Sequence, residues 1–352
     1  MGGIPARVMK MRGETKGMRR AAIVGTGSYL PEDVRRNDFF EGLSLKSVDE
    51  VYFDHTGAEE RRIAPPYMKS SDMEYEAGKR AIESAGIKPE EIDLIIVSSL
   101  IPDEIQPQNA ALIQHKLGAK SAAAINLDSA CSSFINGLIV ANSLIANGTC
   151  NTILVISAAI TTRTLDYTDT TCTMFGDGAG AAVLKPAKTR GCGLIVSDFF
   201  SDGSFYYTMG RKLKKPRGYE GMKNYIEQLP ERVMFYVDKE KRYEELKDAA
   251  KNRPAENAKR ALQKAGLTSA DIDHLFLHQP HKLLIDCWRE GIGVPKEKTY
   301  DTLKKYGNIS NASIPVTLDE VVRSSKIKRN DIVVFCSQGL GFNFSTAIFR
   351  WE

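Results

Sequence analysis

Cys131 is the residue whose type and setting best suit covalent chemistry. It stands in DSACSSF, residues 128–134, a run of small residues directly before an apolar helix predicted over residues 132–147. Its sulfur would lie at a helix N-terminus, where the helix dipole and unpaired backbone N–H groups favour the thiolate. A thiolate there could attack an acyl group and carry it covalently. Buried cysteines are mostly inert packing residues, so the setting alone leaves both interpretations open.

Two polar segments in the second half of the chain could assist such a nucleophile. His278 ends a strand predicted over residues 275–278, and strand ends are where sites gather in layered α/β proteins. The turn YGNISNASIP, residues 306–315, precedes its own helix as the Cys131 turn does. A strand-end His is ordinarily structural, and an Asn in such a turn is ordinarily a helix cap. Their functional interpretation requires a fold that brings these segments to Cys131.

An internal repeat predicts such a fold. Residues 79–98 and 259–278 align without a gap at an offset of 180, with seven of twenty positions identical, and each copy predicts helix, glycine cap, turn and strand. This period is too long for a solenoid and indicates two duplicated α/β halves. Continuous apolar strands such as 153–156 and 332–335 predict sheets covered on both faces. We therefore predict an α/β/α/β/α sandwich with a pseudo-twofold axis.

The two predicted halves are residues 21–190, which carry Cys131, and residues 191–352, which carry His278 and Asn308. Residues 1–20 hold six Lys or Arg against one Glu and predict a disordered basic tail. Residues 201–257 match nothing in the first half and are interpreted as an insertion, helical and partly mobile. Its basic run is either a solvated face or a docking patch for an acidic partner.

Composition and charge exclude several classes of protein. The 352 residues carry 48 Lys plus Arg against 44 Asp plus Glu, and this formal charge of +4 marks neither a nucleic-acid binder nor a polybasic membrane protein. The longest apolar runs are far shorter than the roughly 20 residues that span a bilayer. Six scattered cysteines and the lack of a secretory signal predict no metal site, no disulfide framework and a cytoplasmic location.

The motifs around Cys131, His278 and Asn308, together with further stretches along the chain, resemble those of the thiolase-fold condensing enzymes, most closely the β-ketoacyl-acyl-carrier-protein synthase III group. The resemblance covers residues 21–351 and implies the thiolase-like, duplicated five-layered sandwich. The family's Cys, His and Asn fall on Cys131, His278 and Asn308. The matching stretches are GTGSYLPEDV (25–34), SAGIKPEEIDLIIVSS (84–99), DSACSSF (128–134), FGDGAGAAVL (175–184), HQ (278–279), YGNISNASIP (306–315) and QGLGFNFSTAIFRW (338–351).

The resemblance implies a decarboxylative Claisen condensation in fatty-acid or specialised polyketide biosynthesis. Cys131 would take an acyl starter from a thioester of coenzyme A or acyl carrier protein, with no permanently bound cofactor. A malonyl thioester would then lose CO2, its enolate oxygen held by His278 and Asn308, and would attack the acyl-cysteine. The backbone N–H groups of Cys131 and Leu340 would form the oxyanion hole. The family is dimeric, so a homodimer is expected.

Several positions depart from the family pattern. Val51 and Thr170 stand where a Trp and an Arg usually sandwich adenine, and His55 stands where a further Arg is usual. His281 replaces the Asn that helps hold pantetheine. Gln106 replaces a common aromatic near the acyl pocket, which predicts a more polar pocket and a non-standard starter. Further substrate-binding candidates are Phe134, Gly339 and Gly341, and the carrier-docking candidates are Lys282, Arg211, Lys212, Lys214 and Lys215.

Two other functions stay open at this point. An acyltransferase of the same fold would pass the Cys131-bound acyl group to a hydroxyl or amine without releasing CO2, with His278 as a base. Relatives of that kind often carry Asp in place of Asn308, so the Asn argues against this alternative. A catalytically silent subunit would merely shape the pocket of a heterodimer, and the presence of all three residues argues against that.

Overall fold

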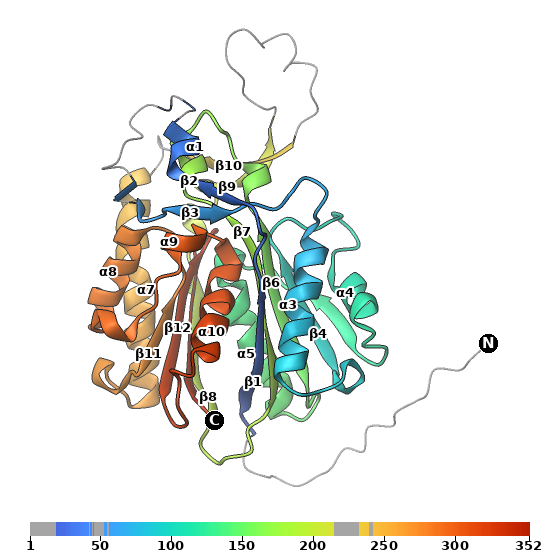
Figure 1. Cartoon of the computed structure of the whole chain (residues 1–352). Coiled ribbons are helices and arrows are strands. Elements are labelled where there is room, and N and C mark those ends of the chain that lie inside the picture. Colours follow the sequence, from blue (N-terminus) through green and yellow to red (C-terminus); the bar gives the residue numbers. More distant parts are fainter. Residues whose placement is uncertain are drawn as a thin grey trace, which may run out of the picture.

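The computed structural model describes residues 19–41, 43, 45, 53–54, 56–214, 232–238 and 242–352. In these residues two β-sheets face each other, with helices between them and on both outer sides (Figure 1). The first sheet has the order β1-β7-β6-β4-β5 and consists of β1 (Ala21–Tyr29), β4 (Leu94–Ser99), β5 (Ala123–Asn126), β6 (Ile153–Ile160) and β7 (Asp177–Pro186). The second has the order β11-β12-β13-β8 and consists of β8 (Gly193–Ser201), β11 (His274–Leu277), β12 (Ile332–Gly339) and β13 (Asn343–Arg350).

Six longer helices form the three helical layers. The middle layer is α5 (Ser133–Ala146) and α10 (Ser313–Arg323), whose apolar side chains share one core cluster with strands of both sheets. The outer layers are α3 (Ser70–Ser84) and α4 (Ala110–Leu117) on the first sheet, and α7 (Tyr243–Ala265) and α8 (Lys282–Ile292) on the second. The predicted α/β/α/β/α sandwich is confirmed. No helix in the described part of the chain is both long and apolar enough to cross a membrane.

Burial of the strands on both faces explains their unbroken apolar sequence. In β4, Leu94 and Ile96 face the middle layer, whereas Ile95 and Val97 pack beneath the outer helices. Successive side chains of a strand point to opposite faces, so two covered faces require an apolar residue at every position. Helix α5 is apolar nearly all round for the same reason, because sheets lie on two of its sides.

The two sheets repeat one topology. β1 pairs antiparallel with β7, β7 antiparallel with β6, and β6 parallel with β4. β8, β13, β12 and β11 repeat this series of directions in the second sheet. Because β7 ends at Pro186 and β8 begins at Gly193, we propose that the halves divide in this connection, which contains the boundary expected after residue 190.

The expected helical insertion over residues 201–257 contains strands as well as helix in the described part of the chain, so the helical expectation is wrong for residues 209–214 and 232–237. β9 (Met209–Lys214) and β10 (Arg232–Val237) form an antiparallel hairpin, and α7 is the counterpart of α3 rather than inserted sequence. The abundant Lys and Glu suggested helix, but the valines and aromatic residues of β10 favour a strand. Residues 1–18 of the expected basic tail lie outside the described residues.

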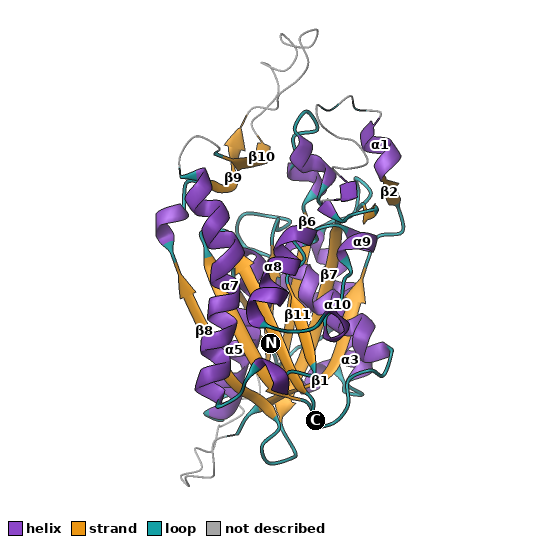
Figure 2. Ribbon diagram, turned by 90° about the vertical axis from the view of Figure 1, so that its left-hand side faces the viewer, coloured by secondary structure: helices purple, strands orange, loops and turns teal. Residues whose placement is uncertain are grey.

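The hairpin lies at one end of the sandwich together with several short elements, most of them from the first half. These are α1 (Asn37–Glu41), the paired strands β2 (Val34–Arg36) and β3 (Glu60–Arg62), and α9 (Leu303–Tyr306) of the second half. Figures 1 and 2 show them gathered at the end opposite the C-terminus. Each half thus places a two-stranded sheet between its first strand and its first long helix.

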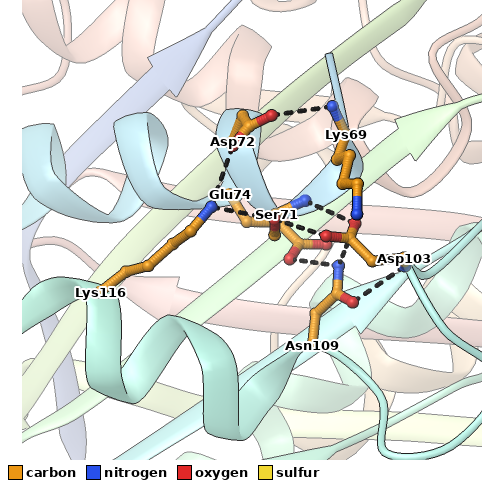
Figure 3. Close-up of polar contacts among 7 residues, drawn as sticks. All are labelled: Lys69, Ser71, Asp72, Glu74, Asp103, Asn109 and Lys116. Carbon is orange, nitrogen blue, oxygen red and sulfur yellow. Dashed lines mark hydrogen bonds and ion pairs between the residues drawn. The ribbon is translucent and has the colours of Figure 1, made fainter. Parts of the chain in front are cut away.

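A buried carboxyl group on α3 holds the loop that follows β4 (Figure 3). Glu74 accepts hydrogen bonds from the Ser99 hydroxyl at 2.5 Å and from the Asn109 side-chain amide at 2.9 Å. Asp103, in the same loop, accepts from the Ser71 hydroxyl at 2.6 Å. Burial, the largest effect, and the nearby Asp103 charge raise the pKa of Glu74 from 4.5 to about 7. The fold therefore favours the protonated form of Glu74.

We expect Glu74→Gln to stabilise the protein at pH 8 relative to its effect at pH 5. A carboxyl group with its pKa raised to about 7 in the fold loses its stabilisation as pH rises through that value, because ionisation favours the unfolded chain. The difference between wild type and variant should shift by about 3 kcal/mol between these pH values, measured by urea unfolding. Glu83→Gln, on the exposed side of the same helix, is the control. An identical difference at both pH values would contradict the assignment.

Candidate active site

Cys131 lies in the turn that leads from β5 into α5. This turn is the 3₁₀ segment η2 (Ala130–Ser132), and Ala130 adopts the left-handed conformation with φ of +51°. The Ser133 hydroxyl fixes the turn by donating to the Ala130 carbonyl at 2.6 Å and accepting from the Ser129 N–H at 2.8 Å. Cys131 as a residue is partly exposed, whereas its thiol group is desolvated, at the start of a helix whose body is buried. This position fixes the sulfur on a well-packed support.

The turn before α10 has the same geometry. In η9 (Ser310–Ala312), Ser310 also has φ of +51°, and the Ser313 hydroxyl donates to the Ser310 carbonyl at 2.8 Å. Ser310 and Ser313 lie 180 residues after Ala130 and Ser133, the offset of the sequence repeat. Asn311 is thus the positional counterpart of Cys131, and its amide donates to the Ser98 carbonyl and hydroxyl at the end of β4.

Ser310 connects the two turns and their functional side chains. Its hydroxyl is hydrogen-bonded to the Cys131 sulfur at 3.1 Å. Its backbone N–H donates to the Asn308 side-chain oxygen at 2.9 Å, and its carbonyl accepts from Ser313, which contacts His278. The structure therefore brings Cys131, His278 and Asn308 into one hydrogen-bonded cluster from three separate elements.

The orientation of the Asn308 amide follows from this network. An N–H group can bond only the oxygen of a side-chain amide, so the contact with the Ser310 N–H assigns Oδ1 and turns the NH2 group the other way. The Asn308 backbone is held between its N–H donation to Met174 and its acceptance from Gly176. The residue is buried and rigid, and it can present an N–H donor to a substrate oxygen.

His278 follows β11 and is almost completely buried. Burial lowers the pKa of its imidazole to about 3, so the ring is neutral at physiological pH. Its Nδ1 contacts the Ser313 hydroxyl at 2.8 Å, which leaves Nε2 for chemistry. When Ser313 donates to Nδ1, Nε2 carries the proton and is a donor; when Ser313 donates to the Ser310 carbonyl, Nε2 is an acceptor.

The Cys131 thiol differs from the expectation of a thiolate stabilised by the helix start. Burial, the largest effect, raises the pKa of Cys131, while the Ser310 hydroxyl and the Arg211 charge act in the opposite direction. A neutral His278 provides no cationic partner for the sulfur. Cys131 is therefore a thiol in the free protein, and deprotonation must accompany its attack on a substrate.

The hairpin between β12 and β13 supports the nucleophile turn from behind. A Cβ atom at Gly339 would lie 2.3 Å from the Ser129 carbonyl oxygen and 3.2 Å from the Cys131 nitrogen. The Ser337 hydroxyl also donates to the Cys131 carbonyl at 3.0 Å. Gly341, with φ of +88°, reverses the chain just after Leu340. The close backbone approach therefore requires glycine at position 339.

Other predicted substrate residues have local roles in the described structure. Phe134 is buried in the core between α5 and both sheets, because the first turn of α5 directs it inward, so the structure places it with the packing residues. His281 caps α8 by accepting from the Leu283 N–H at 3.2 Å. Gln106 is exposed in the loop after β4, and Thr170 is partly exposed.

The predicted carrier-docking residues separate into different environments. Lys282 and Lys212 are exposed, whereas Arg211 is partly buried beside Thr164 and Phe235, which corrects the interpretation of the whole run as a surface patch. The alternation of side chains along β9 separates Arg211 from Lys212. The side chains of Lys214, Lys215 and Arg217, and those of Val51 and His55, lie outside the described residues.

Sequence reasoning missed two residues of the site, Ser310 and Ser313. The 180-residue offset contained a signal for them, since it aligns them with the turn that holds Cys131. The basic run marked Arg211 only as a carrier-docking candidate, because the hairpin that partly buries it was not predicted. No group of three or more His, Cys, Asp or Glu side chains with metal-binding geometry occurs in the described part of the chain.

Comparisons with known proteins agree on one family. The family model for 3-oxoacyl-[acyl-carrier-protein] synthase III matches residues 125–203, and the model for its C-terminal part matches residues 262–351. The chain is 37% identical to a β-ketoacyl-[acyl-carrier-protein] synthase III of Caldanaerobacter subterraneus, covering 94% of this chain and 98% of that protein. It is 38% identical to one from Halalkalibacterium halodurans, covering 95% and 99%.

Solved structures give the same result. The 3-oxoacyl-[acyl-carrier-protein] synthase III of Aquifex aeolicus is 32% identical with a TM-score of 0.82, covering 94% of this chain and all of that chain. The priming β-ketosynthase of the R1128 polyketide pathway is 27% identical with a TM-score of 0.84, covering 97% and 99%. The thiolase-like fold is therefore confirmed.

We expect alkylation of Cys131 by iodoacetamide to accelerate about tenfold per pH unit between pH 7 and pH 9, because the reactive thiolate forms only at high pH. Intact-protein mass spectrometry would follow the modification. Cys131→Ser should abolish this phase, whereas Cys287→Ser, at the other partly exposed cysteine of the described chain, should leave it unchanged. A rate already at its plateau at pH 7 would instead indicate a stabilised thiolate.

Proposed function

The chain belongs to the β-ketoacyl-[acyl-carrier-protein] synthase III family, and on that premise we propose that it condenses an acyl group held on Cys131 with a malonyl thioester, releasing CO2. The observation that carries this assignment is the cluster in which Ser310 links Cys131, Asn308 and, through Ser313, His278. A condensing enzyme needs one nucleophile and two hydrogen-bond donors for an enolate, and these three side chains provide them.

In the first step Cys131 takes the starter acyl group. The sulfur attacks the carbonyl of an acyl thioester, a new carbon–sulfur bond forms, and the bond to the departing thiol breaks. The thiol proton of Cys131 passes to the departing sulfur, and His278 can relay it when Nε2 is the acceptor. The neutral imidazole has a free acceptor in this tautomer, and its low pKa makes it a transient relay of the proton instead of a strong base.

In the second step the malonyl thioester loses CO2 and forms an enolate. The developing negative charge falls on the thioester oxygen, where His278 Nε2–H and the Asn308 NH2 group act as donors in a buried site. The carbanion attacks the acyl-cysteine carbonyl to form the new carbon–carbon bond. The tetrahedral intermediate then expels the cysteine sulfur, which regains a proton, and the β-ketoacyl thioester leaves.

The oxyanion hole for that intermediate is assigned to the backbone N–H groups of Cys131 and Leu340. The packing of Gly339 against the Cys131 backbone supports this assignment, because it brings the turn containing Leu340 next to the nucleophile. Backbone donors held by two packed turns need little reorganisation during reaction.

The substrates are acyl and malonyl thioesters of coenzyme A or acyl carrier protein, in fatty-acid or polyketide biosynthesis, and the chemistry requires no resident cofactor. The relatives named for acyl carrier protein support it as the partner. Exposed Lys282 and Lys212 are candidates for its acidic surface. Transfer of the acyl group to a hydroxyl or amine is the alternative, and a reaction without CO2 release would favour it.

We also propose a homodimer formed through β5. This strand is the open edge of the first sheet, and Ile125 on it, Leu112 on α4 and Ile105 in the preceding loop are exposed apolar side chains. An exposed sheet edge with apolar side chains is a surface that a second chain can cover.

We expect Ile125→Lys to shift the protein from dimer to monomer in sedimentation velocity, because a cation at the covered edge would lose its hydration without gaining a partner. Val34→Lys, at an exposed apolar position on β2, is the control. A monomeric wild type, or a variant that stays dimeric, would contradict this interface.

We expect Asn308→Asp to retain acylation of Cys131 but to lower CO2 release from a malonyl thioester by roughly 100- to 1,000-fold. The Asp keeps the oxygen that accepts from the Ser310 N–H and replaces the NH2 donor with an anionic oxygen, which both removes the hydrogen bond to the enolate and repels its charge. Mass spectrometry would follow the acyl adduct, and labelled malonyl carboxylate would follow CO2. Cys131→Ser should lose the adduct with every donor. Unchanged CO2 release in Asn308→Asp would remove Asn308 from the mechanism.

A further inference from the structure

Arg211 is a partly buried cation of the hairpin β9–β10, and its charge acts on the Cys131 thiol. It stands on β9, where its Nε donates to the Thr164 hydroxyl at 3.2 Å and its guanidinium lies over the Phe235 ring at 5.4 Å. The Phe235 ring packs against Phe175 with centroids 5.2 Å apart, and Phe175 forms a backbone bridge with Asn308. A continuous set of contacts thus connects Arg211 with the candidate active site.

The charge of Arg211 acts electrostatically on the Cys131 thiol. Burial lowers the pKa of its guanidinium to about 10, and Cys131 and Asp128 are the groups that act in the opposite direction. Arg211 in turn lowers the pKa of the Cys131 thiol, although burial outweighs it. The guanidinium stays protonated at physiological pH, so the site contains a permanent positive charge.

This charge has no anionic partner in the described part of the chain. Thr164 is the recorded hydrogen-bond acceptor of Arg211, through Nε, and no carboxylate among the described residues lies within ion-pair distance of its guanidinium. A guanidinium has five N–H donors in a planar fork that matches a carboxylate. Asp128 acts on this charge only from beyond ion-pair distance, so a ligand carboxylate in direct contact would stabilise the partly buried guanidinium further.

The side chains near Arg211 combine aromatic rings with a polar turn. The Thr164 hydroxyl accepts from Arg211 and donates to the Thr161 carbonyl at 2.8 Å. The hydroxyl of Thr161 is buried and has no hydrogen-bond partner in the described residues. The other N–H groups of the guanidinium therefore need a partner besides Thr164.

Two carboxylates could reach a cation beside Cys131: that of malonate and that of a starter. The malonyl carboxylate becomes neutral CO2 in the reaction, so a guanidinium bound to it would stabilise the ground state more than the transition state and slow the step. A carboxylate at the far end of a starter keeps its charge throughout. The second arrangement uses the cation for specificity without opposing the chemistry.

We propose that Arg211 is a specificity-determining residue that binds a terminal carboxylate on the starter, so that the enzyme accepts carboxyacyl thioesters in preference to plain hydrocarbon ones. This inference rests on the proposed function, since it assigns a substrate class to the acyl group of Cys131.

The test compares acylation of Cys131 by succinyl-, glutaryl- and adipyl-coenzyme A with acylation by straight-chain acyl-coenzyme A esters of the same carbon number. In rapid-quench mass spectrometry, the best carboxyacyl donor should react at least about tenfold faster than its neutral match in the wild type. Arg211→Leu should slow that donor by roughly 100-fold and the neutral donor far less, because the neutral donor loses only the effect of the charge on the Cys131 thiol. Arg211→Lys should fall between them, because it keeps the charge and loses the fork.

Arg190→Leu is the control, because it removes an exposed arginine in the connection between β7 and β8. Wild-type selectivity needs no variant, so the test survives a misfolded Arg211→Leu. Neutral donors reacting as fast as carboxyacyl donors in the wild type would overturn the inference while leaving the proposed function intact. An effect of Arg211→Leu confined to malonyl decarboxylation would also overturn it. Failure of every donor to acylate Cys131 would instead count against the proposed function.

Discussion

The start of α5 and the start of α10 meet between the two sheets, and the remaining features of the site depend on this contact. Cys131 and Ser310 are hydrogen-bonded at 3.1 Å, and each turn contains one left-handed residue, Ala130 or Ser310, that directs the chain into its helix. A non-glycine residue in that conformation is costly, so the surrounding structure must hold it. Here the Ser133 and Ser313 hydroxyls do so by the same bond in both halves. A duplicated fold thus builds an asymmetric site, because one copy carries a thiol at the position where the other carries Asn311.

Burial sets the protonation of this site. His278 is neutral because its ring is desolvated, and Cys131 is a thiol for the same reason. An enzyme that relied on a thiolate–imidazolium pair would need the opposite. A neutral imidazole can accept a proton in one step and donate a hydrogen bond in another, provided that Ser313 can change the atom to which it donates. The Ser313 hydroxyl is therefore a positioning group for both half-reactions.

The hairpin β9–β10 carries the residue to which we attribute the choice of starter, Arg211. It occupies the place in the second half that β2 and β3 occupy in the first, and one of its side chains, Arg211, turns inward. The chemistry that we propose for Cys131, His278 and Asn308 depends on the two helix starts and β11, whereas the choice of starter would depend on the side chains around the acyl group. These two parts can change independently, because they belong to different elements of the fold.

The sequence determined the architecture because its signals are local. The gapless repeat predicted two equal halves, the unbroken apolar strands predicted doubly covered sheets, and the small residues around Cys131 predicted a helix start. The motifs around Cys131, His278 and Asn308 were enough to indicate a condensing enzyme. The tertiary structure decided which neighbours these residues have: Ser310 against the thiol and Ser313 against the imidazole. It also placed Arg211 on a hairpin, in a segment whose Lys and Glu residues had suggested a helix. Those contacts join residues far apart in the chain, and their electrostatic consequences depend on burial, which no short stretch of sequence specifies.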